Sequence, residues 1–386
     1  MSTRREFLKL TTLPLACSSA ALLRIAAIAQ ANGVPPDQPV PATVYVTGAQ
    51  SLRSHADHAG LLMGCAVRPE KLENDAEYAS LVGQQVNLLV AENAMKWRDL
   101  RPTPGTFDFR AADEVVAFAS AHRQRVRGHN LCWHKALPDW FAATATRANA
   151  RQIFTNHIQT VVSHFAGHIH SWDVVNEPLD LKDGRADGLR QAPWLDLIGD
   201  DYIELAFRTA KEADPTALLT LNEAGIQHDT KAQRDKRDRL FDLLKRLKKR
   251  GVPIDAVGIE SHLATTGPQP GSGVRDFVRD VRKLEMQVFL TEVDVSDQFT
   301  DGSDAQRDVA VARVYKDYLS TMLAEPNVTV LVTWGITDRY TALSKPEYER
   351  RDEKPQRPLP FDASCQPVPA FFAVRDAIDR HQFGKA

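Results

Sequence analysis

Short apolar runs alternate along the chain with longer segments in which apolar residues recur at helical spacing. The runs have the length and β-branched content of buried strands, and eight of them lie at 61–67, 86–91, 126–133, 169–175, 217–221, 257–259, 288–293 and 328–334. The helical segments include 111–121, 151–165, 202–213, 231–249 and 309–323. Eight such units without a change of composition between them predict a single α/β domain, a (β/α)8 TIM barrel.

An open, doubly wound sheet is the alternative architecture for this alternation. That fold usually carries a glycine-rich phosphate-binding turn, and neither a GxGxxG motif nor a P-loop occurs in the sequence. The chain has 386 residues, of which 43% are hydrophobic and 25% charged, so it is long enough for one large barrel. Its net charge of −2 is spread evenly, so we expect a neutral ligand and no binding to nucleic acid.

The segment SWDVVNEPLD places a carboxylate where a strand must end. Val174 and Val175 suit a buried strand, and Pro178 cannot donate to a sheet, so the chain leaves the sheet at Asn176 and Glu177. In a (β/α)8 barrel the carboxyl ends of the strands carry the chemistry. Glu177 is therefore a candidate catalytic residue.

Similar side chains follow the other predicted strands, and in a barrel they converge on one rim. The set contains carboxylates, imidazoles, amides and indoles but no spacing typical of a metal or nucleotide site, so we expect neither a metal nor a cofactor. A neutral sugar stacked on aromatic rings fits this rim. Its members are Glu92, Asn93, Lys96, Trp97, His129, Trp133, Asn176, Glu177, Glu260, His262, Glu292, Asp294 and Trp334.

Two carboxylates are sufficient to break a glycosidic bond without a cofactor. One protonates the departing oxygen, and the other meets the oxocarbenium-like centre, directly in retaining enzymes and through water in inverting ones. Glu177 ends the fourth predicted strand and Glu292, in FLTEVDV, ends the seventh. These positions face one another across a barrel, so we expect Glu177 and Glu292 to form the pair.

The chain resembles the endo-1,4-β-xylanases of glycoside hydrolase family 10 as a divergent member, over nearly all of the sequence after its first residues. The resemblance rests on LLMGCAV, NLLVAENAMKW, RGHNLCWH with LPDWF, WDVVNEP, VGIESHL, LTEVDV and VTWGITDRY. NEP alone is shared by a large clan of barrel hydrolases. ENAMKW, RGHNLCWH and ESHL are more specific to the family.

The resemblance implies roles for these residues. Glu177 would be the acid/base and Glu292 the nucleophile, with Asn176 binding the 2-hydroxyl of the sugar that is cleaved. His262 would hold Glu292, and Asp294 would orient His262. The glycone sugars would bind to the remaining rim residues, with Trp334 as part of the aromatic wall: Glu92, Asn93, Lys96, Trp97, His129, Trp133 and Glu260.

Four departures from the family pattern fall in the expected site. Glu260 stands where the family usually has glutamine, so we expect like-charge repulsion to keep Glu260 protonated and activity to favour acidic pH, a preference that Glu260→Gln should change. The segment from Asn222 to Gly225 reads NEAG where Asn-Asp-Tyr-Asn is usual, Ala342 replaces a tryptophan and Ala136 a glutamine. We expect a wider or less adhesive cleft.

The first 31 residues resemble a twin-arginine export signal. Arg4 and Arg5 precede a mildly apolar run that ends in AQA, and Arg24 and Pro14 make the alternative, a membrane-spanning anchor, a poor fit. We expect residues 32–41 to form a linker and 42–386 the barrel, and the protein to be periplasmic or secreted, without a stable membrane anchor.

Other groups of polar residues are interpreted as structural. His157, His164, His168 and His170 precede the fourth strand, away from the catalytic rim, and we expect a solvated helix and loop there. The basic segment 231–250 carries leucines at helical spacing and is predicted to be an outer helix. Three cysteines follow the export segment, and we expect Cys65 and Cys132 to be buried free thiols.

The leading hypothesis is therefore a retaining endo-xylanase that acts on xylan or xylo-oligosaccharides as a monomer. A retaining β-glycosidase for a different or heavily substituted β-glycan is the enzymatic alternative. A carbohydrate-binding barrel without activity is the alternative from another class of protein. The presence of both Glu177 and Glu292 argues against a pure binding protein.

Overall fold

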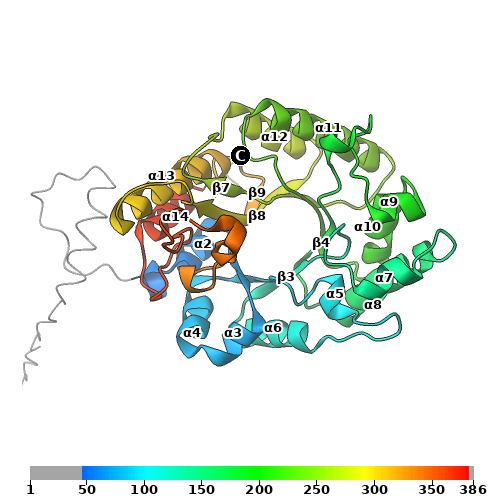
Figure 1. Ribbon diagram of the computed structural model, residues 1–386, viewed down its shortest axis with the longest axis horizontal. Helices are drawn as coiled ribbons and strands as arrows, with labels where there is room; N and C mark the ends of the chain where they lie inside the picture. Colours follow the sequence, from blue (N-terminus) through cyan, green and yellow to red (C-terminus); the bar gives the residue numbers. More distant parts are fainter. Residues whose placement is uncertain (1–45, 382–386) are drawn as a thin grey trace, which may run out of the picture. The chain divides into compact units, whose positions relative to one another are not determined.

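The computed structural model describes residues 46–381 as a closed parallel barrel surrounded by helices, which confirms the predicted fold (Figure 1). The predicted export segment and linker lie outside the described residues. The barrel strands are β1 (Leu62–Val67), β2 (Leu88–Ala91), β3 (Arg125–His129), β4 (Ser171–Asn176), β5 (Leu218–Glu223), β6 (Ala256–Ile259), β8 (Gln287–Ser296) and β9 (Val328–Thr333).

Each barrel strand pairs in parallel with its neighbours, in the order β6-β5-β4-β3-β2-β1-β9-β8, and pairing between β6 and β8 closes the ring. The short strand β7 (His262–Ala264) was not predicted. It pairs with the stretch from Asp294 to Ser296, which extends β8 beyond the predicted run. The strand that carries Glu292, the seventh along the predicted barrel, is therefore β8.

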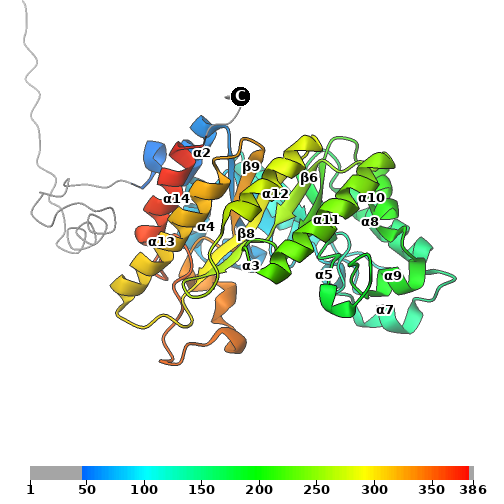
Figure 2. The ribbon, with the colours of Figure 1, turned by 90° about the horizontal axis from the view of Figure 1, so that it is seen from above.

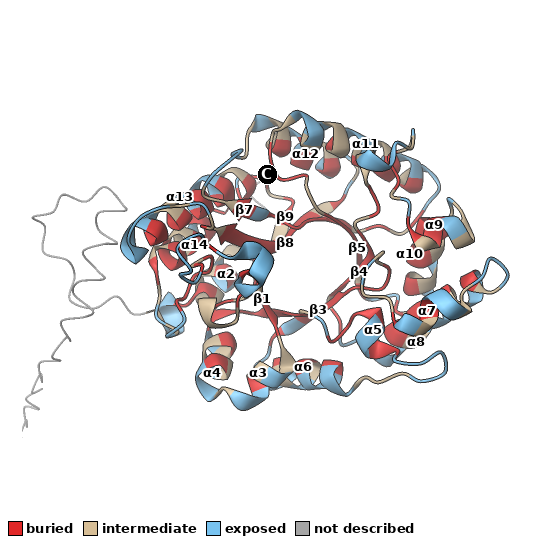
Figure 3. Ribbon diagram, in the orientation of Figure 1, coloured by how far each residue is buried: buried red, intermediate tan, exposed pale blue. Residues whose placement is uncertain are grey.

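Helices form the outer layer, and their buried residues face the strands or neighbouring helices (Figure 3). Their bounds are α2 (Leu52–Ala59), α3 (Pro69–Asn74), α4 (Ala76–Gln85), α5 (Trp97–Leu100), α6 (Arg110–Ala121), α7 (Asp139–Thr144), α8 (Ala150–His164), α9 (Pro193–Ile198), α10 (Tyr202–Ala213), α11 (Lys231–Lys249), α12 (Ser272–Lys283), α13 (Asp304–Met322) and α14 (Pro369–Asp379). Single 3₁₀ turns occur at η1 (Gly48–Gln50), η2 (Leu181–Asp183), η3 (Asp338–Tyr340), η4 (Ala342–Ser344) and η5 (Pro346–Tyr348). Within residues 46–381, none of the helices combines the length and the apolar character that a membrane crossing requires.

The long loops gather at one end of the barrel. In Figure 2, α7, α9 and the orange segment after β9 lie at the lower end, opposite the end marked C. These segments follow β3, β4 and β9, so this is the carboxyl end of the strands. The barrel interior beneath it is filled by a cluster that includes Leu88, Val90, Phe289, Val330 and Val332. A packed interior leaves the carboxyl rim as the place for a site.

The structural interpretations of the basic segment and the cysteines are confirmed. Helix α11 covers the basic segment and buries the leucine stripe of Leu240, Leu243, Leu244 and Leu247. Cys65 and Cys132 are buried free thiols. The stripe forms because apolar side chains at helical spacing share one face of the helix.

The expectation of a solvated histidine cluster is wrong for His157. His164 and His168 are exposed, whereas His157 is fully buried with its ring 3.6 Å from that of Trp97. It lies on the inner face of α8, and neither ring nitrogen has a hydrogen-bond partner among the described residues. Burial, together with the positive charge of Arg101, holds the pKa of His157 well below its ordinary value.

His157 should make the protein labile to acid. Because His157 stays neutral in the fold while the unfolded chain binds a proton near pH 6.5, its contribution to stability is complete above that pH and is lost as the pH falls below it. The loss approaches about 1.4 kcal/mol per pH unit. We expect His157→Phe to reduce the fall in Tm between pH 7.5 and pH 5, measured by calorimetry.

Exposed His168 offers the matched control for this prediction. His168→Phe should retain the wild-type change in Tm between the two pH values. If Tm falls as much in His157→Phe as in the wild type between pH 7.5 and pH 5, the prediction is contradicted, whatever the absolute Tm of the variant.

Candidate active site

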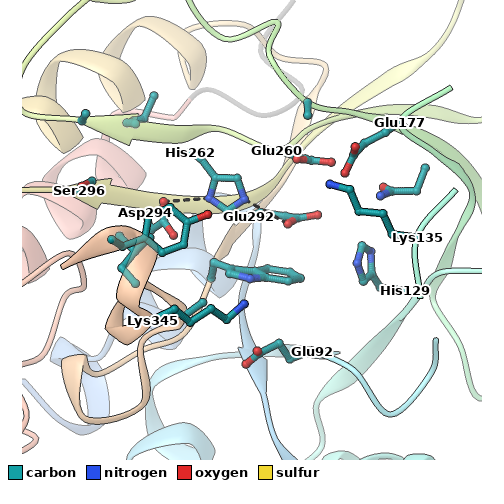
Figure 4. A pocket seen from close by; sticks show the side chains of 18 of the residues that line it. Glu92, His129, Lys135, Glu177, Glu260, His262, Glu292, Asp294, Ser296 and Lys345 are labelled. Atoms are coloured by element: carbon teal, nitrogen blue, oxygen red, sulfur yellow. Dashed lines mark hydrogen bonds and ion pairs between the residues drawn. The ribbon is translucent and has the colours of Figure 1, made fainter. Parts of the chain in front are cut away.

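A cavity of about 1030 Å³ opens at the carboxyl ends of the barrel strands. All of the predicted site residues except Trp97 line it, so the fold brings together side chains from the ends of six of the predicted strands (Figure 4). Those that line it are Glu92, Asn93, Lys96, His129, Trp133, Asn176, Glu177, Glu260, His262, Glu292, Asp294 and Trp334.

Glu292 is held by an imidazole, as predicted. His262 Nε2 lies 3.3 Å from Glu292 Oε2, and Asp294 Oδ1 lies 2.9 Å from His262 Nδ1. Although burial alone lowers the pKa of His262, the carboxylates of Asp294 and Glu292 raise it well above its ordinary value. Burial conversely raises the pKa of Glu292, but the hydrogen bond from His262 and nearby positive charges lower it below its ordinary value. This direction favours the ionised form of Glu292, which is the form that the predicted role as nucleophile requires.

Asn222 connects the two sides of the site and was not among the predicted site residues. Its Nδ2 donates to Asn176 Oδ1 at 2.7 Å and to Glu292 Oε1 at 3.2 Å, and Thr291 Oγ1 donates to its Oδ1 at 2.7 Å. The side chain is fully buried at the end of β5. Its position at the end of an apolar strand could have identified Asn222 from the sequence. Only closure of the barrel, however, places it between Asn176 and Glu292.

Arg190 fixes the backbone that presents Glu177. Glu177 has a left-handed φ of +50°, which is uncommon for a residue with a side chain. Its N–H donates to Asn222 O at 2.9 Å, and Arg190 Nε donates to its carbonyl at 2.9 Å. Arg190 Nη2 also lies 3.7 Å from Glu177 Oε2. The sequence reading missed Arg190 because it lies in the loop beyond β4, outside any strand end.

Glu223 holds the loop that follows β4 and carries Arg190. Its Oε2 accepts a hydrogen bond from Leu179 N at 3.1 Å, and its Oε1 lies 2.7 Å from Lys236 Nζ. Glu223 is fully buried, and burial raises its pKa to about 7 against the opposing charge of Lys236. Glu223, which departs from the family pattern, therefore helps to hold the loop in place. Its side chain does not line the cavity.

Glu260 is a third carboxylate in the site. It is 5% exposed, and the one hydrogen bond of its side chain among the described residues comes from Asn222 Nδ2 at 3.4 Å. Burial, followed by the charges of Glu292 and Glu177, raises the pKa of Glu260 well above its ordinary value. This direction agrees with the expectation that Glu260 is protonated. The effect of Glu260→Gln on the pH profile stays a prediction.

A buried ionic chain supports the floor of the cavity. His129 Nδ1 lies 2.8 Å from Asp173 Oδ2, and Asp173 Oδ1 accepts from Arg127 Nη2. All three residues are at most 3% exposed. The charges therefore compensate each other inside the barrel, and His129 is oriented beside Trp334, whose ring lies edge-on to it at 5.4 Å. Arg127 and Asp173 were not predicted, because each lies within an apolar run.

The residues at the carboxyl ends of β1 and β2 form a second polar cluster. Arg68 binds Glu92 through two hydrogen bonds of 2.7 and 3.1 Å. Lys96 Nζ donates to Asn93 Oδ1 at 3.1 Å and lies 5.1 Å from the centre of the Trp133 ring. These contacts fix donors and an aromatic face at one end of the cavity, an arrangement that suits a sugar ring.

The prediction that Trp97 binds substrate is wrong. Trp97 is 2% exposed, lies outside the cavity lining, and donates its Nε1–H to the carbonyl of Leu131. It opens α5, and its ring packs against those of His157 and Trp194. Because the helix turns away from the cavity at this point, the indole supports the segment that carries Trp133 instead of contacting a ligand.

Two exposed aromatic residues line the outer part of the cavity. Phe299, in the loop after β8, is 61% exposed, and Tyr348, in η5, is 38% exposed. Ala342, at the family's tryptophan position, lines the cavity beside Trp334. Ala342 presents no ring to the cavity, whereas Phe299 and Tyr348 supply other aromatic surface, so the expectation of a wider or less adhesive cleft stays a prediction. They were missed because neither follows a strand directly.

Comparisons with known proteins agree with this geometry. The profile described as Glycosyl hydrolase family 10 matches residues 51–377. The chain is 37% identical to Endo-1,4-beta-xylanase A of Thermoanaerobacterium saccharolyticum over 84% of its own length, and 36% identical to Exoglucanase XynX of Acetivibrio thermocellus over 84%. It spans 28% and 29% of those two proteins.

A solved structure extends this likeness to three dimensions. Xylanase 10B of Thermotoga petrophila, in complex with xylobiose, superposes with a TM-score of 0.77 at 31% identity and covers 86% of this chain and 97% of that one. A profile match over most of the chain and a shared fold at this identity establish the family. The chain belongs to glycosyl hydrolase family 10.

Proposed function

We propose that the protein is a retaining endo-1,4-β-xylanase, which acts as a monomer on xylan or xylo-oligosaccharides without a cofactor. The observation that carries the proposal is the placement of Glu177 and Glu292 in one cavity, with Glu292 held by His262 and Glu177 presented by Arg190. Xylanases among the relatives, and a relative crystallised with xylobiose, support the choice of substrate.

The proposed reaction is a double displacement. Ionised Glu292 attacks the anomeric carbon while Glu177 protonates the departing oxygen, and a glycosyl ester of Glu292 forms. Water then attacks that ester, Glu177 takes its proton, and the β-anomer is released. Asn176, fixed by Asn222 at 2.7 Å, is placed to bind the 2-hydroxyl of the reacting sugar.

Hydrolysis of unsubstituted xylohexaose tests this proposal. The mature protein should release xylobiose and xylotriose, and NMR spectra recorded during the first turnovers should show the β-anomers before mutarotation. Release of α-anomers would refute retention. Release of xylose alone from one chain end would refute endo action.

A different β-glycan is the second candidate substrate. It is supported by the 36% identity to a protein named an exoglucanase and by the altered positions Glu260, Ala224 and Ala342, all of which line the cavity. No cleavage of xylohexaose together with cleavage of cello-oligosaccharides or decorated xylan would favour it. A folded protein that binds xylohexaose and turns over no aryl β-glycoside would instead favour the carbohydrate-binding alternative.

Phe299 should contribute to binding of long substrates. Stacking on an aromatic face is worth about 0.5–1.5 kcal/mol, or roughly two- to tenfold in affinity. We expect Phe299→Ala to raise KM for xylohexaose within that range while leaving kcat/KM for an aryl xylobioside unchanged, because the loop after β8 lies at the outer cavity. Steady-state kinetics on both substrates measures this.

Val309 provides the control for Phe299. It is 38% exposed, lies on α13, and is absent from the cavity lining, so Val309→Ala should change neither parameter. An equal effect of Phe299→Ala on both substrates would contradict a role confined to long chains.

We also propose that residues 1–31 direct export to the periplasm or beyond and are removed, without leaving a membrane anchor. Arg4, Arg5 and the AQA sequence support this. In a bacterium with a twin-arginine pathway, replacing both arginines by lysine should retain the protein inside the cell. N-terminal sequencing of the exported protein should begin near residue 32, and an uncleaved exported chain would refute the proposal.

A further inference from the structure

The departure at Glu260 creates a group of ligand-type atoms that the sequence spacing did not reveal. Glu260, His262 and Glu292 each offer one atom, and all of these atoms lie within 4.8 Å of one another. Glu260 directly follows β6, His262 begins β7 and Glu292 lies within β8. Figure 4 shows the carboxyl groups of Glu260 and Glu292 pointing into the cavity beside the His262 ring. Carboxylate oxygens and an imidazole nitrogen are ligand atoms that Zn²⁺ accepts, and three protein ligands leave a fourth position for water.

The imidazole is already oriented as metal-binding histidines are. Asp294 Oδ1 accepts the hydrogen bond from His262 Nδ1 at 2.9 Å, which leaves Nε2 to face the carboxylates. Histidine ligands almost always donate their other ring N–H to such a partner, which fixes the tautomer and the ring. Ser261, with a left-handed φ of +66°, lies between Glu260 and His262 and turns both toward the cavity.

The side chain of Glu260 is buried without a lysine or arginine partner in the part of the chain that the structure describes. Among residues 46–381 no lysine or arginine forms an ion pair with it, whereas Glu92 and Glu223 are paired with Arg68 and Lys236. Its surroundings include two further acids, Glu177 and Glu292, and it is 5% exposed. Burial of the ionised form is costly, so Glu260 holds a proton, and a divalent cation bound at the same place can replace that proton and supply the compensating charge.

We propose that Glu260, His262 and Glu292 bind a divalent transition-metal cation of the Zn²⁺ class, and that this cation inhibits the enzyme. The ion takes the place of two protons, the one between His262 Nε2 and Glu292 Oε2 and the one on the Glu260 carboxyl group, and both protons pass to solvent. Ligand bonds of about 2.1 Å place ligand atoms roughly 3.4 Å apart in a tetrahedron, so a side-chain movement of about 1 Å completes the site. Water from the cavity takes the fourth position.

The cation would inhibit the enzyme because Glu292 belongs both to the metal site and to the pair of glutamates that cleave the sugar. This step rests on the proposed function. A cation on Glu292 blocks the carboxylate that attacks the sugar. The glutamine that the family usually has at position 260 supplies a neutral oxygen, which binds Zn²⁺ poorly, so the site depends on the glutamate of this chain. Mg²⁺ prefers oxygen ligands and should not compete.

Direct metal binding tests the site without reference to activity. The untagged mature protein, treated with chelator and dialysed, is titrated with Co²⁺ at pH 7 while its visible d–d absorption is recorded, and Zn²⁺ is titrated by calorimetry. We expect one tight cation per chain, and at least about tenfold weaker binding in Glu260→Gln, which keeps the shape of the side chain. Glu92→Gln is the matched control, since Glu92 lines the same cavity outside the group, and it should bind as the wild type does.

Zn²⁺ inhibition of xylohexaose cleavage is then measured for each variant relative to its own uninhibited rate. The wild type and Glu92→Gln should lose activity with the same dependence on Zn²⁺, and Glu260→Gln should need at least about tenfold more. Equal Co²⁺ and Zn²⁺ binding by all three proteins would assign the metal to surface pairs such as His164 with Asp113 and would overturn the proposal. Glu260-dependent binding by a protein that cleaves no xylan would refute the proposed function and leave the metal site standing.

Discussion

Replacing Glu292 by alanine should lower kcat on xylohexaose by on the order of 10⁴-fold or more, because it removes the carboxylate that we propose attacks the anomeric carbon. Glu292 accepts hydrogen bonds from Asn222 and faces His262 across 3.3 Å, so the substitution leaves a small space at the base of the cavity. Azide can enter such a space. With a dinitrophenyl β-xylobioside, azide should restore turnover and yield the α-glycosyl azide, which NMR identifies.

The stereochemistry of the azide product makes this prediction specific. Azide that replaces the nucleophile attacks the face from which Glu292 acts, so the product has inverted configuration. The isosteric Glu292→Gln variant is the control: it should be equally inactive on xylohexaose but should not be rescued, since the space remains filled. Substantial residual activity in both variants, once contaminating wild-type enzyme is excluded, would mean that Glu292 is not the nucleophile.

Replacing Glu177 by alanine should affect substrates according to their leaving groups. Protonation by a positioned acid contributes about 10²–10⁴-fold, so hydrolysis of xylohexaose should fall by that factor. A dinitrophenolate leaves without protonation, so the first step on a dinitrophenyl xylobioside should persist and the glycosyl ester of Glu292 should accumulate. A rapid burst of dinitrophenol followed by slow turnover is the expected observation in stopped-flow measurements.

The configuration of the azide product distinguishes Glu177→Ala from Glu292→Ala. Here azide takes the place of water in the second step, and the product should be the β-glycosyl azide, of retained configuration. Glu223→Gln is a useful comparison, because Glu223 holds the same loop through Leu179 N but does not line the cavity. That variant should reduce activity on both substrates alike, without a burst. A leaving-group-independent loss in Glu177→Ala would contradict its role as the acid.

The sequence was sufficient to predict the barrel and most of its rim. Apolar runs of strand length, alternating with amphipathic helices, allow few other architectures, and a polar residue directly after such a run must lie at the carboxyl rim. This reasoning located Glu177, Glu260 and Glu292 by number. The resemblance of the motifs to family 10 added their roles, which the residues alone did not supply.

The residues that sequence reasoning missed lie where it has no local signal. Arg127 and Asp173 sit inside apolar runs, and only the closed ring makes them a buried pair with His129. Arg190 lies in a loop whose path back to Glu177 depends on Glu223 and Lys236. Trp97 was misassigned for the same reason: a residue near a strand end points into or away from the cavity according to the turn that follows.

The sequence by itself determined the fold class, the strand ends and the type of chemistry, because periodicity and residue type are local properties. The tertiary structure alone decided which side chains touch. It placed Asn222 between Asn176 and Glu292, buried His157 against Trp97, and brought Glu260 beside Glu292 and His262. Such contacts join residues far apart in the chain, and their charge and desolvation depend on distances that exist only after the barrel has closed.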